Sequence, residues 1–288
     1  MEYRKFGQTD MVLSTVGLGG LLAHYEGVSG HPPATEKRRI YLRAAELGIN
    51  LFDMGYGDEV HIPDELKGYQ DDRYFSLKVG APTAAELGDK VDQHLANVRR
   101  DAIDILRVHH YAYVGDEALA ARIAQLKEAG KVRAVCTIRH MLADQQAYAE
   151  RGPEPDADAD LVIYNYVCRW QGPGIDLAAA ADKGVLIMKA LGGQWVSWAD
   201  KARTDWSAVG QSKVEELSPR GEGIRGELSL VYPIVSGPWH ELAEPGEEVP
   251  RTQRALSWVL ANKGVHCILV AFASVEELEE GIGVKELA

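Results

Sequence analysis

Residues 103–136, IDILRVHHYAYVGDEALAARIAQLKEAGKVRAVC, have the pattern of a strand–helix–strand unit. The apolar segments 103–108 and 132–136 predict buried strands, and the Ala- and Leu-rich segment 116–130 predicts an amphipathic helix between them. Asp116 favours a helix start there, because an acceptor side chain satisfies the free amides of a first turn. This stretch therefore predicts one βα unit of a parallel sheet.

The alternation of predicted strands and helices extends along the whole chain, in about eight strand–helix pairs. Predicted strands cover 14–18, 50–53, 74–78, 103–108, 132–136, 160–164, 185–189 and 265–270. Predicted helices cover 34–47, 83–99, 116–130, 141–150, 173–183, 250–262 and 274–282, with only a brief helix between the second and third strands. Runs that are apolar on both faces indicate parallel strands covered by helices, and eight such units can close into a (β/α)8 TIM barrel. An open doubly wound sheet is the alternative.

The chain length of 288 residues suits one α/β barrel, so we expect a single domain over 1–288. Hydrophobic residues make up 46% and charged residues 26% of the chain, which are ordinary globular values. The segment 191–248 interrupts the rhythm after the seventh strand, and it is rich in Gly and Pro and contains four tryptophans. We expect a long βα loop that forms an ordered pocket wall.

Composition also restricts the partners. The formal net charge of −12 argues against nucleic acid, because phosphate binding requires clustered Lys and Arg. We expect no membrane association, since no segment has the roughly 18 consecutive apolar residues of a span and the amino terminus lacks a signal core. Cys136, Cys168 and Cys267 follow no metal-ligand spacing, so we expect no metal, and they are too few to cross-link a chain of this size, which predicts a cytoplasmic protein.

Four polar residues lie at or just after predicted strand ends. Asp53, Lys78 and His109 end the second, third and fourth strands, and Tyr56 follows Asp53 by three positions. In a barrel the carboxyl ends of the strands converge on one mouth. A phenol, with a reference pKa of about 10, becomes a usable acid when a lysine stands beside it and an aspartate keeps that lysine charged. A histidine can then orient a carbonyl, so the four residues could protonate a carbonyl oxygen.

Several segments spread over nearly the whole chain carry a family resemblance. They are Met1–Asp10, Val16–Gly20, Leu47–Asp53, Lys78–Gly80, Ile103–His109, Leu126–Arg133 and Val185–Gly193. In this order they resemble the signature segments of the aldo-keto reductases. The nearest likeness is to a bacterial branch that often carries a ferredoxin module, whose cysteines this sequence lacks.

The resemblance implies a (β/α)8 barrel that reduces a small-molecule carbonyl, or oxidises the alcohol, with NADP or NAD. It assigns the catalytic tetrad to Asp53, Tyr56, Lys78 and His109. It implies a cofactor site of Gly19, Asp53, Arg139, Asn165, Lys189, Glu277 and Glu280, and a substrate site of Tyr25, Tyr111, Trp170 and Trp195. The family usually places its Tyr five residues after the Asp, whereas here the separation is three.

The cofactor positions depart from the family pattern. Ile138 and Arg139 replace a Ser-Asn pair that holds the nicotinamide amide, Leu161 replaces a Gln, and Met188 replaces a stacking Tyr. Glu277 stands where relatives carry an Arg that binds the 2′-phosphate of NADP, so a preference for NAD is expected.

Three functions fit these observations. The first is a nicotinamide-dependent oxidoreductase with Tyr as general acid. The second is a lyase, isomerase or cyclase that kept the barrel but works by acid-base chemistry without the cofactor. The third is a ligand-binding protein without catalysis.

Overall fold

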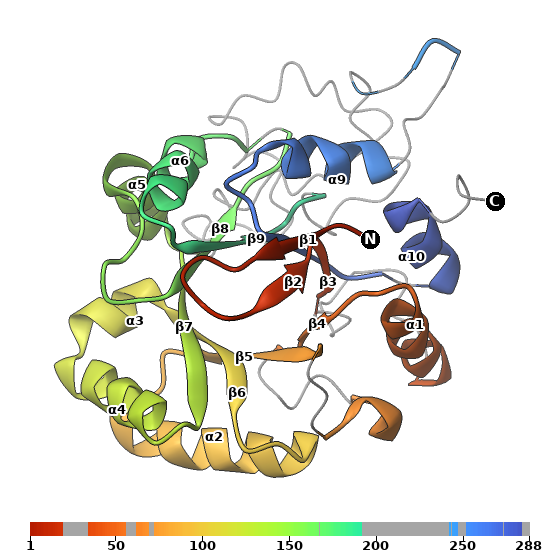
Figure 1. The fold of residues 1–288 in the computed structure, drawn as a ribbon. Coiled ribbons are helices and arrows are strands. Elements are labelled where there is room, and N and C mark those ends of the chain that lie inside the picture. The colour runs from red at the N-terminus through yellow and green to blue at the C-terminus, as the bar shows by residue number, and fades with distance from the viewer. Residues whose placement is uncertain are drawn as a thin grey trace, which may run out of the picture.

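A closed barrel of eight parallel strands forms the centre of the protein (Figure 1). The computed structural model describes residues 1–19, 34–55, 62–68, 72–166, 168–191, 242, 244–246, 252–272 and 274–283. The barrel strands are β3 (Val16–Leu18), β4 (Leu51–Asp53), β5 (Tyr74–Gly80), β6 (Ile103–His109), β7 (Val132–Ile138), β8 (Ala159–Ile163), β9 (Gly184–Met188) and β10 (Cys267–Val270). They pair in chain order, and β10 pairs with β3 to close the ring. The expected (β/α)8 fold is confirmed, and the open sheet is excluded.

Helices surround the barrel. They are α1 (Ala34–Glu46), α2 (Ala84–Val98), α3 (His110–Gly115), α4 (Glu117–Glu128), α5 (Leu142–Arg151), α6 (Gly172–Ala180), α9 (Thr252–Ala261) and α10 (Val275–Ile282), with a 3₁₀ turn η1 (Asp64–Leu66). Helix α1 packs beside α10, α2 beside α4, and α5 beside α6 (Figure 1). Within the described residues, no helix is long and apolar enough to cross a bilayer.

Two helix starts carry capping side chains, and the start that the sequence predicted at Asp116 is confirmed. The Asp116 side chain accepts hydrogen bonds from the amides of Ala118 and Leu119 at the start of α4. The Ser274 side chain accepts from the amide of Glu277 at the start of α10. Each cap satisfies amides that have no partner within the helix.

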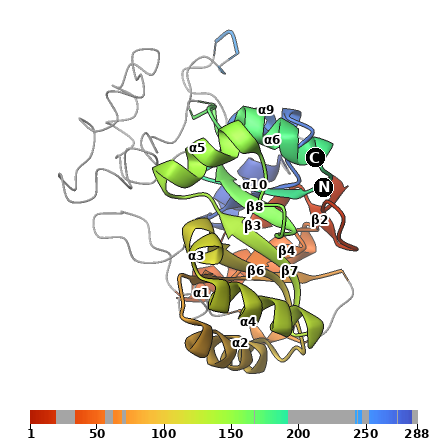
Figure 2. The same ribbon diagram turned by 90° about the vertical axis from the view of Figure 1, so that its left-hand side faces the viewer.

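An antiparallel hairpin of β1 (Tyr3–Lys5) and β2 (Val12–Ser14) closes the amino-terminal end of the barrel (Figure 2). Phe6, Met11 and Leu13 are fully buried and join the apolar cluster inside the barrel. The hairpin was not predicted, and the first strand was expected to begin at residue 14, which instead ends β2. The short strands carry mixed burial, so their apolar residues gave no clear alternation.

Alternate residues of the barrel strands face opposite sides, as the pleat requires. On β6, Ile105 belongs to the interior cluster, whereas Leu106 and Val108 pack with α2 and α4. On β9, Leu186 faces the interior and Ile187 faces the outer helices. This alternation decides which strand-end residues can reach the mouth.

His266 stabilises the amino-terminal end as a neutral ring. Its Nδ1 accepts a hydrogen bond from the amide of Val185 at 3.1 Å, and the ring packs edge-on against Phe6 with centroids 5.7 Å apart. Burial, with a smaller contribution from the positive charge of Arg4, lowers the pKa of His266 to about 4. The folded protein therefore resists protonation of this ring.

We expect His266 to make the protein acid-sensitive. Its folded pKa of about 4 lies below the ordinary value of 6.5, so the unfolded chain binds the proton more readily between these values. Stability is thus complete above pH 6.5 and is lost as the pH falls toward 4. From pH 7 to pH 5 the free energy of unfolding should fall by about 2 kcal/mol more in the wild type than in His266→Gln, which does not titrate. Urea denaturation at both pH values measures this, and parallel losses would contradict it.

Candidate active site

Three of the predicted catalytic residues lie on adjacent strands and face the barrel interior. Asp53 ends β4 and pairs in register with Ser76, Lys78 pairs with Arg107 of β6, and His109 ends β6. Residues two apart on a strand share a face, so Lys78 stands one inward position beyond Ser76 and His109 one beyond Arg107. Asp53 is buried, whereas Lys78 and His109 are half-buried. The structure therefore brings Asp53, Lys78 and His109 to one end of the barrel, as expected.

The carboxylate of Asp53 is fixed by two donors. Its Oδ1 accepts from the guanidinium of Arg107 and from the amide of Gly55, the latter at 2.8 Å. The side chains of Arg107 and Asp53 are only 4% and 9% exposed. From the sequence, Lys78 was expected to be the partner of this carboxylate, and Arg107 had no predicted role. The ion pair that the structure shows at Asp53 is with Arg107.

A bulge in β5 follows Lys78. Lys78 pairs with Arg107 and Gly80 with Val108, so two residues of β5 advance against one of β6. A bulge of this kind turns the strand locally and is common beside active sites. The Gly80 backbone has a φ of 69°, a left-handed conformation that glycine adopts without steric cost. The bulge sets the direction in which β5 leaves Lys78.

Aromatic rings line the mouth next to His109. Tyr111 stacks on His109 with centroids 5.3 Å apart and planes 19° apart, and His140 lies on a tilted plane with its centroid 6.4 Å from His109. Tyr111 is 47% exposed, so a ligand can contact its ring. Tyr111 therefore lies beside His109 with part of its ring accessible, and its contact with a substrate stays a prediction. His110 faces elsewhere, because its ring nitrogens contact Asp144 and Glu154 at 2.7 and 3.1 Å.

Arg139 was expected to contact the cofactor, and the structure corrects this expectation. Its Nε lies 2.6 Å from Oδ1 of Asp160, and the two side chains are 2% and 0% exposed. Its guanidinium also lies over the ring of Tyr148 on α5, 5.5 Å from the centroid. The side chain is therefore buried between the sheet and α5, because Arg139 follows the inward-facing Ile138 and points to the opposite side.

Asn165 and Lys189 connect the ends of β8 and β9. The side-chain amide of Asn165 donates to the Lys189 carbonyl at 2.9 Å, and its oxygen accepts from the Cys168 amide at 2.8 Å. Lys189 has a φ of 62°, unusual for a residue with a side chain, and the bond to Asn165 helps to hold it. Asn165 thus acts in the structure as a backbone clamp, and the half-buried Lys189 stands at the end of β9.

The first turn of α10 is acidic. Glu277 is exposed there, and the carboxylate of Glu36 on α1 accepts a hydrogen bond from the Val275 amide at 3.2 Å. Glu280 accepts from the amide of Thr252 at 3.3 Å, at the start of α9. An amide that could have bound an anion at this helix start is therefore already paired with a carboxylate.

Of the remaining predicted residues, the structure describes Gly19 and Trp170. Gly19 donates its amide to Val270 at 2.7 Å, and a Cβ there would approach the Ala271 nitrogen to 3.0 Å, so its small size serves closure of the barrel. The Trp170 indole donates to Gln145 on α5 at 2.8 Å. Tyr25, Tyr56, Trp195 and nearly all of the loop 191–248 lie outside the described residues.

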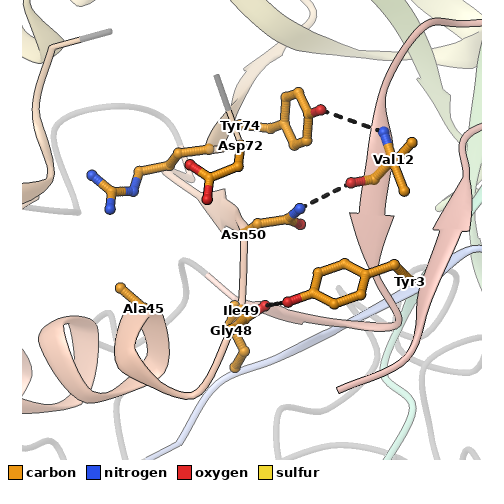
Figure 3. Close-up of a pocket in the computed structure, with 9 residues that line it drawn as sticks. Tyr3, Val12, Ala45, Gly48, Ile49, Asn50, Asp72 and Tyr74 are labelled. Carbon is orange, nitrogen blue, oxygen red and sulfur yellow. Dashed lines mark hydrogen bonds between the residues drawn. The ribbon is translucent and has the colours of Figure 1, made fainter. Parts of the chain in front are cut away.

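A cavity of about 370 Å³ lies at the opposite, amino-terminal end of the barrel (Figure 3). The Tyr3 hydroxyl donates to the Gly48 carbonyl at 2.9 Å, and the Asn50 amide donates to the Val12 carbonyl at 2.9 Å. These polar groups attach the hairpin to the barrel. In barrel enzymes the amino-terminal face contributes stability, and catalysis belongs to the carboxyl end.

Two residues of the site were missed from the sequence. Arg107 interrupts the apolar strand 103–108 two positions before His109, and residues two apart on a strand share a face. A charged residue on the inward face of an apolar strand could therefore have indicated that Arg107 belongs to the site. The contact of Glu36 with α10 had no such signal, because it joins two helices 239 positions apart.

Burial makes the two nearby cysteines poor nucleophiles. Cys136 faces the interior beside Arg107, and burial raises the pKa of its thiol well above the ordinary value, with a smaller effect from Asp160. Burial also raises the pKa of Cys168 to about 12. A thiol with a raised pKa is inert at neutral pH, so the chemistry of the mouth belongs to other groups.

Comparisons with known proteins agree with this fold. The model of the Aldo/keto reductase family matches residues 15–288. YqkF of Bacillus subtilis, an uncharacterised oxidoreductase, is 22% identical over 98% of this chain and 90% of its own length. The holo form of aldo-keto reductase AKR11C1 from Bacillus halodurans superposes with a TM-score of 0.66 at 20% identity, covering 99% of this chain and 91% of that one. A candidate aldo-keto reductase from Pseudomonas aeruginosa gives 0.63 at 19% identity, covering 99% and 95%.

We expect Arg139→Met to destabilise the fold. Removing one partner leaves Asp160 as a buried unpaired charge, which costs about 3–5 kcal/mol. Burial already raises the pKa of Asp160, and Arg139 is the main group that opposes this effect. Lys131→Met is the control, because its ion pair with Asp92 is exposed and should contribute less than about 1 kcal/mol. Urea denaturation compares the two, and equal losses would refute the structural role of Arg139.

Proposed function

Because the chain belongs to the aldo-keto reductase family, and is thus a carbonyl or alcohol oxidoreductase, we propose that it interconverts an aldehyde or ketone with the alcohol by using NAD(H) or NADP(H). Tyr56 is the proposed general acid. The observation that carries this proposal is the convergence of Asp53, Lys78 and His109 on the inward faces of β4, β5 and β6. These three residues suit the reaction, because an aspartate and a lysine can favour the phenolate of a neighbouring proton donor and a histidine can orient the carbonyl.

Each residue has a defined role in this proposal. Lys78 favours the phenolate of Tyr56, which strengthens the phenol as an acid. His109, held against Tyr111, orients the substrate carbonyl at the mouth. When bound, a nicotinamide supplies or accepts the hydride at the carbonyl carbon. The exposed face of Tyr111 gives an apolar substrate group a surface to pack on.

The fit of the chain to a nicotinamide is uneven. Lys189 and Gly19 lie at strand ends around the mouth, where a cofactor phosphate or backbone contact is feasible. Arg139 is buried behind the sheet, and both polar atoms of the Asn165 side chain bind the backbone. These two contacts favour the second candidate function, a lyase, isomerase or cyclase that uses the same acid-base residues without a cofactor.

Titration of the purified protein with NADH and with NADPH separates the two candidates. The chain has six tryptophans, so quenching of their fluorescence reports binding. Binding of either nucleotide supports the oxidoreductase proposal, and binding of neither overturns the nicotinamide dependence. Consumption of NADH or NADPH with 4-nitrobenzaldehyde as a reactive probe then tests turnover.

We expect Tyr56→Phe to lower turnover by about 10²–10⁴ while nucleotide affinity is kept, because only the proton donor is removed. Lys78→Met should lower turnover as well, since a phenol without a nearby cation holds its proton too tightly. Tyr113→Phe is the matched control, because its hydroxyl bonds to the Asp156 carbonyl on the outer surface. If Tyr56→Phe turns over like the wild type, the acid lies elsewhere, and Tyr25, Tyr111 and His140 become the candidates.

We expect NADH to bind more tightly than NADPH. Glu36 and Glu277 gather at the start of α10, where the family resemblance puts the 2′-phosphate, and carboxylates repel it. Glu277→Arg should improve NADPH relative to NADH about ten-fold, equivalent to about 1.4 kcal/mol. Glu150→Arg on the distant helix α5 makes the same charge change and should leave the ratio unaltered. Fluorescence titration measures the dissociation constants of both nucleotides for all three proteins, and tighter NADPH binding by the wild type would refute the role of Glu277.

A further inference from the structure

We propose that Arg107 is a positioning residue that tunes the acid of the proposed reaction, by holding Asp53 and adding a fixed positive charge beneath the mouth. This inference rests on the proposed function. It concerns a group that does not itself touch the substrate, because the Arg107 side chain is 4% exposed.

Arg107 occupies the center of the candidate site. It precedes His109 by two positions on β6, so the two side chains share the inward face. It pairs in register with Lys78 on one side and with Cys136 on the other. Its guanidinium contacts Asp53 from across β5. Arg107 is therefore in register with Lys78 and in contact with Asp53, and it lies one inward position before His109.

The charge balance of this region is positive. Among the inward residues of β4, β5 and β6, Asp53 is the one carboxylate, and Lys78 and Arg107 are two basic side chains. A guanidinium stays protonated in proteins, so its charge is constant over the working pH range. In a poorly solvated interior a charge acts more strongly on its neighbours than in water. The fixed cation therefore stabilises negative charge that develops on a phenol or carbonyl oxygen at the mouth.

The presence of this ion pair is not explained by stability. The Nε of Arg107 is buried and, within the described residues, donates no hydrogen bond. A buried donor without an acceptor is destabilising, and replacing both members of a buried ion pair by apolar side chains is often neutral or stabilising. Removing Arg107 alone would leave Asp53 as a buried unpaired charge, so the arginine is needed once Asp53 stands at the site. The pair as a whole is thus better explained by the chemistry of the mouth than by packing.

The test compares the pH dependence of 4-nitrobenzaldehyde reduction in the wild type, Arg107→Met, Arg107→Lys and Arg100→Met. Arg100 is the matched control, because it forms an equally buried ion pair with Asp104, 3% and 1% exposed, before β6 begins. Removal of a nearby positive charge raises the pKa of an acid. In Arg107→Met the alkaline limb of the kcat profile should therefore move up by about one pH unit, and kcat at pH 7 should fall about ten-fold.

The other measurements separate tuning from folding. KM and the dissociation constant of the nucleotide should stay within about two-fold in Arg107→Met, because Arg107 touches neither ligand. Arg107→Lys retains the charge and should keep the wild-type profile, as should Arg100→Met. Should Arg107→Met fail to fold, Arg107→Gln, which keeps a donor for Asp53 without the charge, carries the same expectation.

Two results would overturn the proposal. One is an unshifted profile in Arg107→Met or Arg107→Gln, whatever happens to kcat. The other is an equal shift in Arg107→Lys or in Arg100→Met, which would assign the effect to packing. A folded wild type that binds neither nucleotide and has no turnover would instead remove the proposed function, and the role of Arg107 with it.

Discussion

The strict alternation of side chains along the closed barrel is the constraint on which the rest of the structure depends. Each strand has one face toward the interior and one toward the helices, so moving a residue by one position changes its surroundings completely. Asp53, Lys78 and His109 face the interior together because each occupies an inward-facing position of its strand. Arg139, one position after the inward Ile138, lies behind the sheet with Asp160.

The barrel itself could be predicted because its signals are local. The run 103–108 is apolar and short, and Asp116 marks the start of α4 through acceptors within three residues. Each of the eight expected strands overlaps an observed one, although β5, β6 and β7 extend further than their apolar runs suggested. A polar residue such as His109 continues a strand once a neighbouring strand pairs with its backbone.

The partners of the site residues could not be predicted, because they depend on contacts between distant segments. The pairing of Asp53 with Arg107 requires the side chains of β4 and β6 to meet across β5. The family resemblance named positions and not partners, so it assigned Arg139 and Asn165 to the cofactor without the buried contacts that the structure gives them. The available clue in the sequence was that position 107 faces the same side of its strand as His109.

The hairpin at the amino-terminal end has a consequence for the order of events in a catalytic cycle. Because Phe6, Met11 and Leu13 fill that end of the described barrel, a molecule reaches Asp53 and Lys78 from the carboxyl end and leaves by the same side. Two molecules that use one entrance obstruct each other, so the one that sits deeper must arrive first and depart last. For a reaction with two such molecules, a barrel closed in this way therefore favours an ordered sequence of arrivals and departures.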